Sequence, residues 1–78
     1  MPLTVRDLAL IRETRAALAD GSARAARIAA GVTQAELADL AGVSRSAVTL
    51  WEMRARRPRG AGALAYGRAL AKVTRRAA

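Results

Sequence analysis

Apolar residues recur at intervals of three and four positions along most of this chain, and glycine, serine or threonine stands between the periodic segments. Such spacing places apolar side chains on one face of a helix. In the first segment, 4–19, Leu8, Ile11 and Leu18 mark that face and Arg15 interrupts it. The periodicity predicts an all-α fold, a compact bundle of about five helices.

Capping signals give the expected ends of the helices. Two pairs have the [ST]xx[DE] spacing of a capping box, in which a hydroxyl accepts from a free amide and a carboxylate accepts from the capping residue's own amide. Glycine suits a helix C-terminus because it tolerates a positive φ. The signals are Thr4 with Asp7, Thr33 with Glu36, Asp20-Gly21, Ser22, Gly31, Gly42 and Ser44.

Two further helices are expected on either side of the central segment. Ser22 is expected to cap the first, 23–30, and the second covers 63–76 after a loop over 54–62. Glycine within a helix costs about 1 kcal/mol relative to alanine, so we expect a close helix contact at Gly67. The expected inner faces consist of Ala25, Ala26, Ile28 and Ala29 in the first helix, and Leu64, Gly67, Leu70, Ala71 and Val73 in the second.

Residues 33–53 have the pattern of two short helices joined by a tight turn. Two helices that meet at a steep angle need a small side chain where their axes come closest, and Ala38 suits that place. In the second helix, 45–53, Val48 and Trp51 are spaced to face inward. The pattern favours a helix-turn-helix motif, and the alternative is an ordinary corner of two helices in a small helical protein.

The composition limits the chemistry that this chain can perform. Its 78 residues are expected to form one domain, 1–78, without cysteine or histidine. We therefore expect no enzyme, no metal or cofactor, and no small-molecule ligand. No apolar run approaches the roughly 18 residues of a membrane span, and the N-terminus lacks a signal-peptide layout, so we expect a cytoplasmic protein without a membrane partner. Thirteen arginines against one lysine are typical of a GC-rich bacterial or phage genome.

Positive charge is concentrated in the second half of the chain. Residues 1–44 carry five arginines and five acidic residues, whereas residues 45–78 carry nine basic residues and Glu52 alone, which places the net charge of +8 there. This distribution indicates a polyanionic partner, and double-stranded DNA is the expected one; a solvated basic face is the alternative. The loop contributes Arg54, Arg56, Arg57 and Arg59, either as phosphate contacts or as solubilising charge. Arg75 and Arg76 suit the helix dipole, with nucleic-acid contact as the alternative.

Four segments carry a family resemblance: RIAAGVTQAELA at 27–38, GVSRSAV at 42–48, Trp51-Glu52 and Arg57-Pro58. Over about residues 23–73 the chain resembles the lambda-repressor-like (Cro/cI, xenobiotic-response-element) helix-turn-helix family. The resemblance implies a compact helical DNA-binding domain whose recognition helix, here 45–53, enters the major groove, and a homodimer on a two-fold operator.

The resemblance also implies roles for single residues. Arg45, Ser46, Thr49 and Leu50 fall where the family places base-reading side chains, Gln34 falls at its backbone-anchoring glutamine, and Ser44 joins the expected phosphate contacts. Arg27 and Glu52 match a partly buried ion pair that ties the first core helix to the recognition helix. An arginine fork pairs with guanine at about 1–3 kcal/mol of discrimination, whereas a leucine can only contact a thymine methyl. The alternatives are a phosphate contact for Arg45 and plain surface hydroxyls for Ser46 and Thr49.

Three features depart from the family pattern. Leu50 stands where many members have a polar or basic residue. Arg54 replaces the glycine that usually follows the recognition helix, so that helix either runs longer or ends in a strained left-handed residue. The usual fifth helix is missing, and helix 4–19 either fills its place or forms a dimer contact.

Three functions are consistent with these patterns. The first is a sequence-specific DNA-binding transcriptional regulator, a small phage or bacterial repressor of Cro type. The second is an antitoxin that binds a toxin partner and represses its own operon, which the additional helix 4–19 favours. The third is an architectural protein that binds DNA regardless of sequence.

Overall fold

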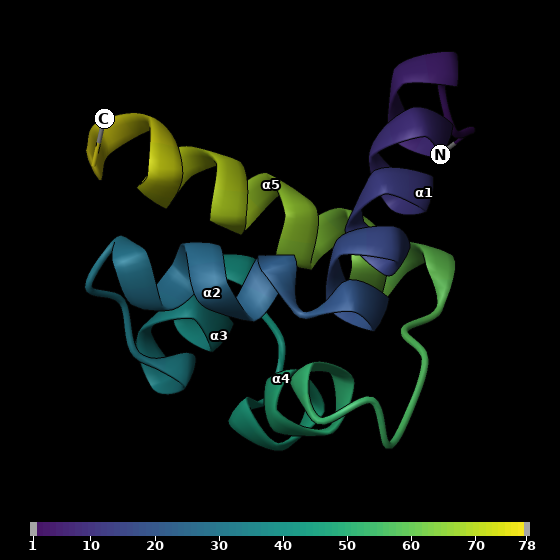
Figure 1. Ribbon diagram of the computed structural model, residues 1–78. Coiled ribbons are helices and arrows are strands. Elements are labelled where there is room, and N and C mark those ends of the chain that lie inside the picture. The colour runs from purple at the N-terminus through teal and green to yellow at the C-terminus, as the bar shows by residue number, and fades with distance from the viewer. Residues whose placement is uncertain (1, 78) are drawn as a thin grey trace.

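The computed structural model describes residues 2–77, with side chains up to Arg75, and these residues form five helices and no strand (Figure 1). The expected all-α bundle of about five helices is confirmed. The Arg76 side chain lies outside the described residues. The helices are α1 Val5–Asp20, α2 Ser22–Ala29, α3 Gln34–Ala41, α4 Arg45–Glu52 and α5 Gly60–Ala77.

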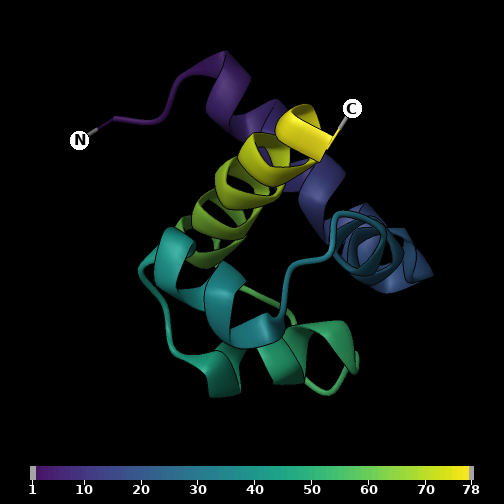
Figure 2. The ribbon, with the colours of Figure 1, turned by 90° about the vertical axis from the view of Figure 1, so that its left-hand side faces the viewer.

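The last helix, α5, packs against α1, α2 and α3, and α4 packs mainly against α3. Figures 1 and 2 both show α4 at the end of the molecule opposite the N-terminal turns of α1. One side of α4 therefore faces away from the bundle. Along residues 2–77, no helix combines the length and the apolar character that crossing a bilayer requires.

All five helices contribute buried side chains to the core. Leu37, Val48 and Tyr66 are its largest fully buried side chains, each at 0% exposure. Trp51 contacts Tyr66 edge to face, with the ring centroids 6.3 Å apart and the planes at 74°. This geometry suits the charge distribution of aromatic rings. Val48 and Trp51 face inward as predicted, whereas the burial of Tyr66 was not predicted from the sequence.

Most of the capping signals act as expected. The Thr4 and Thr33 hydroxyls accept from Asp7 N and Glu36 N at 3.0 and 3.1 Å, and both carboxylates accept in return from the capping amides. Gly42 ends α3 with a φ of 71°. The prediction for Ser22 is wrong: Gly21, at a φ of 85°, is the N-cap of α2, and Ser22 is its first residue. The Ser22 amide instead donates to the Asp20 carboxylate at 2.8 Å.

The predicted inner face of α2 is also wrong. Ala23 and Arg27 are buried, Ala26 is half-buried, and Ala25 and Ala29 are exposed. Ile28 is 54% exposed. The reason is the pairing of Arg27 with Glu52 in the core, which turns the other side of α2 toward the bundle. In α1, Ile11 and Leu18 are buried as expected. Leu8, one turn before Ile11 on the same face, is 46% exposed because the other helices cover it only in part.

The last helix begins earlier than predicted, at Gly60 instead of residue 63, so the predicted loop over 54–62 is too long. Its second glycine packs closely: a Cβ on Gly62 would lie 2.8 Å from the Trp51 ring. The close contact expected at Gly67 is confirmed, because a Cβ there would overlap the Thr14 hydroxyl and lie 3.1 Å from Leu10. Of the expected inner-face residues, Gly67 is buried and Leu64, Leu70, Ala71 and Val73 are half-buried, while Ala63, Tyr66 and Ala69 are buried at the centre of that face.

Candidate nucleic-acid interface

The turn between α3 and α4 is short and held by backbone hydrogen bonds. After Gly42, the Val43 amide donates to the Ala38 carbonyl at 3.1 Å. The Ser44 hydroxyl then accepts from the Ala47 amide at 3.0 Å and begins α4. Ala38 is 2% exposed, consistent with a small side chain at the contact of the two helices. The local sequence thus holds α4 in a fixed position against α3.

The four expected base-reading side chains lie together on the outer face of α4. Arg45 and Ser46 are exposed, and Thr49 and Leu50 are half-buried. These four residues line one surface groove. On the inner face, Val48, Trp51 and Glu52 are buried, so α4 has one side fixed in the core and one side open to a ligand.

A buried ion pair fixes the end of α4. Arg27 Nε and Nη2 donate to the two Glu52 carboxylate oxygens, each at 2.8 Å, and Arg27 Nη1 donates to the Val32 carbonyl at 2.8 Å. Tyr66 Oη also donates to Glu52 at 2.8 Å. The Arg27–Glu52 pair agrees with the expectation from family resemblance, whereas no sequence pattern indicated that Tyr66 joins it.

Burial alone would raise the pKa of Glu52, but the hydrogen bonds from Arg27, Gln34 and Tyr66 outweigh it and hold this pKa below its usual value. Burial and the neighbouring carboxylate raise the pKa of Tyr66. Glu52 is therefore ionised and Tyr66 neutral at neutral pH, which is the combination that their hydrogen bond requires.

Two expected DNA contacts are connected to this ion pair. Gln34 Nε2 donates to Glu52 Oε1 at 3.1 Å, and Gln34 Oε1 accepts from the Thr49 hydroxyl at 2.8 Å. Gln34 is the first residue of α3, and Thr49 lies on the outer face of α4. The side chain of Gln34 therefore joins the buried centre to the exposed groove.

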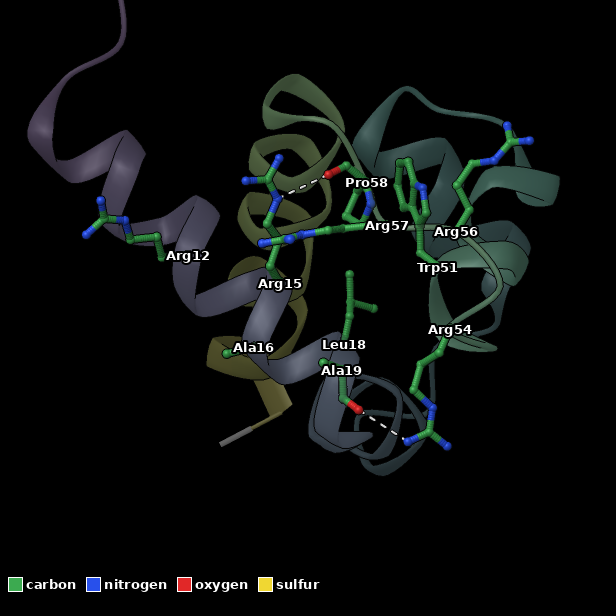
Figure 3. A pocket seen from close by; sticks show the side chains of 10 residues that line it. All are labelled: Arg12, Arg15, Ala16, Leu18, Ala19, Trp51, Arg54, Arg56, Arg57 and Pro58. Carbon is green, nitrogen blue, oxygen red and sulfur yellow. Dashed lines mark hydrogen bonds between the residues drawn. The ribbon is translucent and has the colours of Figure 1, made fainter.

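The loop after α4 carries the exposed arginines Arg54, Arg56, Arg57 and Arg59. Arg54, which follows the C-cap Met53, has a φ of 62°, so the chain leaves α4 through a left-handed residue, the second of the two outcomes expected there. Arg54 Nη1 donates to the Ala19 carbonyl at 3.2 Å, and Arg15 Nε donates to the Pro58 carbonyl at 3.1 Å (Figure 3). Both bonds tie the loop to α1.

Between this loop and α1 lies a pocket of about 590 Å³ (Figure 3). Leu18, Trp51 and Pro58 form its apolar part, and no acidic side chain lines it. Its arginines are Arg12, Arg15, Arg54, Arg56 and Arg57. The basic surface was expected in the second half of the chain alone, so the contribution of Arg12 and Arg15 from α1 was not predicted. The one sequence feature that pointed to it is that Arg15 interrupts the apolar face of its helix.

A family model described as Helix-turn-helix matches residues 24–74, more than half of the chain. The chain belongs to the lambda-repressor-like helix-turn-helix family. It is a DNA-binding helix-turn-helix regulator, and all of α1 lies before the matched region. Searches of curated proteins and of solved structures found no match. Within residues 2–77, no group of three or more His, Cys, Asp or Glu side chains is placed to hold a metal ion.

Proposed function

We propose that this helix-turn-helix protein is a single-domain, sequence-specific transcriptional repressor of Cro type, from a phage or a bacterium, that acts in the cytoplasm and reads the major groove with α4. The observation that carries the proposal is the groove formed by Arg45, Ser46, Thr49 and Leu50 on the outer face of a helix whose inner face is buried. A helix held in this way can enter a groove about 12 Å wide without losing its contacts to the bundle.

Each side chain of the groove has a distinct chemistry toward base edges. Arg45 is exposed at the first turn of α4, where its fork can donate to guanine O6 and N7. Leu50 has no polar group and can contact only the methyl group of thymine. Ser46 is exposed on the same side and can donate or accept. Arg45 thus contributes most of the discrimination between sequences.

The proposed phosphate contacts surround this groove. One hydrogen of Gln34 Nε2 is donated to Glu52, and the second is available for a phosphate oxygen. Ser44 begins α4, where amide groups and the helix dipole favour an anion. Beyond the other end of α4, the loop adds Arg54, Arg56, Arg57 and Arg59, which are exposed.

The proposed partner arrangement is a homodimer on a two-fold operator. The longest dimension of one copy is 32 Å. Helix-turn-helix dimers bind half-sites one turn of DNA apart, about 34–36 Å centre to centre. Two copies of this size fit side by side on consecutive major grooves.

The test is selection of bound sites from random duplex DNA. A palindromic consensus is expected, and its half-site spacing reports the dimer. Arg45→Ala should then weaken binding to the selected site by about tenfold or more, with a much smaller loss on random DNA. Binding without a consensus would show an architectural protein, and equal losses on both DNAs would show that Arg45 contacts phosphate only.

A second candidate is an antitoxin that represses its own operon. The N-terminal segment outside the family match exposes Leu3, which precedes α1, and Val5 and Leu8 in the first turn of α1. These side chains offer an apolar surface for another protein. Co-purification with a small toxic protein encoded beside this gene would support this candidate. A gene without such a neighbour would count against it.

A further inference from the structure

Two hydrogen bonds connect Glu52 through Gln34 to Thr49, and their donors and acceptors can be assigned in only one way. An ionised carboxylate has acceptors and no donor, and Glu52 lies against the positive charge of Arg27 at 2.8 Å with its side chain 1% exposed. Whatever part of Gln34 faces Glu52 must therefore donate, which requires the amide NH2 group. The other end of the amide, Oε1, is then the end that faces Thr49, in agreement with the contacts at 3.1 and 2.8 Å.

This orientation of Gln34 determines where the Thr49 hydroxyl donates its hydrogen. A threonine hydroxyl has one hydrogen and two lone pairs. Because Gln34 Oε1 can only accept, the single hydrogen of Thr49 is used inside the protein. A helical threonine otherwise bonds its hydroxyl to a carbonyl one turn back, as Thr74 does with the Leu70 carbonyl at 2.9 Å. Thr49 is half-buried and lines the groove with Arg45, Ser46 and Leu50, so a ligand in the groove meets a hydroxyl whose lone pairs are still available.

We infer that Thr49 acts toward DNA only as a hydrogen-bond acceptor, and that Gln34 imposes this by taking its proton. The base that Thr49 contacts then carries an exocyclic amino group in the major groove, which means adenine N6 or cytosine N4. Guanine O6, thymine O4 and purine N7 are acceptors and give Thr49 no hydrogen bond. The inference rests on the proposed entry of α4 into the major groove and specifies what one position of the operator must offer.

The test begins with the site that the wild-type protein selects. Thr49→Val keeps the shape of the side chain and removes the hydroxyl, so the base pair whose preference weakens in the variant is the one that Thr49 contacts. In synthetic duplexes, the amino group of that pair is deleted by placing purine for adenine or pyrimidin-2-one for cytosine. A second duplex removes N7 of the purine of that pair with a 7-deaza base and keeps its exocyclic group.

Deleting the amino group should weaken binding of the wild-type protein by about three- to tenfold, the range of one neutral hydrogen bond, and should cause no further loss in Thr49→Val. Removing N7 should affect both proteins equally. Three results would each overturn the inference while leaving sequence-specific binding intact. The first is that removing N7 weakens only the wild-type protein, the second is that deleting the amino group weakens the wild-type protein and Thr49→Val equally, and the third is that Thr49→Val changes the preference at no base pair. Selection of no consensus would overturn the proposed function and this inference with it.

Gln34→Met tests the positioning role separately. Methionine fills a similar volume but cannot take the Thr49 proton, so the hydroxyl can turn between the carbonyl one turn back and an acceptor on the DNA. The variant should tolerate the amino-deleted duplex and should accept a keto base at that position. Its fold is checked by helical circular dichroism and by retention of the preference that Arg45→Ala abolishes. Ser46→Ala is the matched control, since no hydrogen bond joins Ser46 to Gln34 among the described residues. Ser46→Ala should change DNA preference equally in the wild-type protein and in the Gln34→Met variant. An unchanged amino dependence in Gln34→Met would show that Gln34 does not set the direction of the bond.

Discussion

Arg27 and Glu52 form two hydrogen bonds of 2.8 Å although their side chains are only 8% and 1% exposed, so the last residue of α4 is tied to α2 inside the core. Glu52 is the only acidic residue in the basic half of the chain. The groove residues Thr49 and Leu50 lie three and two positions before it on α4. A buried pair at this point fixes the helix that carries the proposed base contacts.

Replacing Arg27 by methionine should therefore destabilise the fold strongly. The change leaves the Glu52 carboxylate buried without its counter-charge, and such losses cost about 3–5 kcal/mol. The total stability of a domain is only about 5–15 kcal/mol. The measurement is chemical denaturation followed by circular dichroism. Arg68→Met is the control, because Arg68 pairs with Asp7 at 3.0 Å while its side chain is 60% exposed. The denaturation midpoint of this variant should equal that of the wild-type protein. Equal midpoints for both variants would contradict the structural role of the buried pair.

The same carboxylate predicts a loss of stability in acid. Burial opposes ionisation, but the hydrogen bonds from Arg27, Gln34 and Tyr66 prevail, so the pKa of Glu52 is lower in the folded state than in the unfolded state. The unfolded chain then binds more protons near pH 4, and the free energy of unfolding must fall as the pH drops from about 4.3, the unfolded value, through the folded pKa. At higher pH the contribution is fully present.

Denaturation at pH values from 7 to 3 measures this dependence. Hydrogen bonds from Thr4 and Thr33 lower the pKa values of Asp7 and Glu36, so these capping carboxylates add to the slope. Glu52→Gln keeps the capping boxes and removes the buried carboxylate. Its stability should depend less steeply on pH below 4 than that of the wild-type protein. Identical slopes would show that Glu52 does not contribute to the acid sensitivity.

Local signals in the sequence predicted much of the fold because the physics that they encode is local. A hydroxyl and a carboxylate three residues apart satisfy helix-end amides whatever surrounds them, which is why the boxes at Thr4 and Thr33 were predicted correctly. Gly42 and Ser44 were predicted for the same reason. The places of these caps set the turn, and the turn sets which side of α4 faces outward.

Features that depend on distant partners were not predictable in this way. Ile28 was expected inside because it is apolar, yet the pairing of Arg27 with Glu52, 25 positions away, decides the orientation of α2. The role of Tyr66 was not predictable from its neighbours in the sequence, because its hydroxyl donates to Glu52 on another helix. The hydrogen bond between Gln34 and Thr49 likewise needs both helices in place. Family resemblance indicated which residues form the candidate interface. That Thr49 donates to Gln34 became known only from the structure.

Gly67→Ala should destabilise the protein although alanine is the better helix former. The gain in helix propensity is about 1 kcal/mol, but the new Cβ would overlap the Thr14 hydroxyl and press on Leu10, and overpacking a core costs about 1–3 kcal/mol. Gly60→Ala is the matched control on the same helix, since its Cβ would meet Ile11 at an ordinary 3.7 Å. Denaturation midpoints should fall for the first variant and be maintained or rise for the second. A stabilised Gly67→Ala would show that α1 and α5 can separate without cost.

Arg54→Gly and Arg54→Ala should separate stability from DNA binding at the end of α4. Position 54 has a φ of 62°, which costs a residue with a Cβ about 1–2 kcal/mol, so the glycine variant should be more stable than the alanine variant by about that amount. Both variants lose the hydrogen bond to the Ala19 carbonyl and the proposed phosphate contact. Their DNA affinity should therefore change alike, with the slope of log K against log salt reduced in magnitude by about 0.9. Denaturation and salt titrations measure the two effects independently. Equal stability of the two variants would mean that the backbone relaxes at this position. An unchanged salt slope would show that Arg54 contacts no phosphate and only joins the loop to α1 through its hydrogen bond.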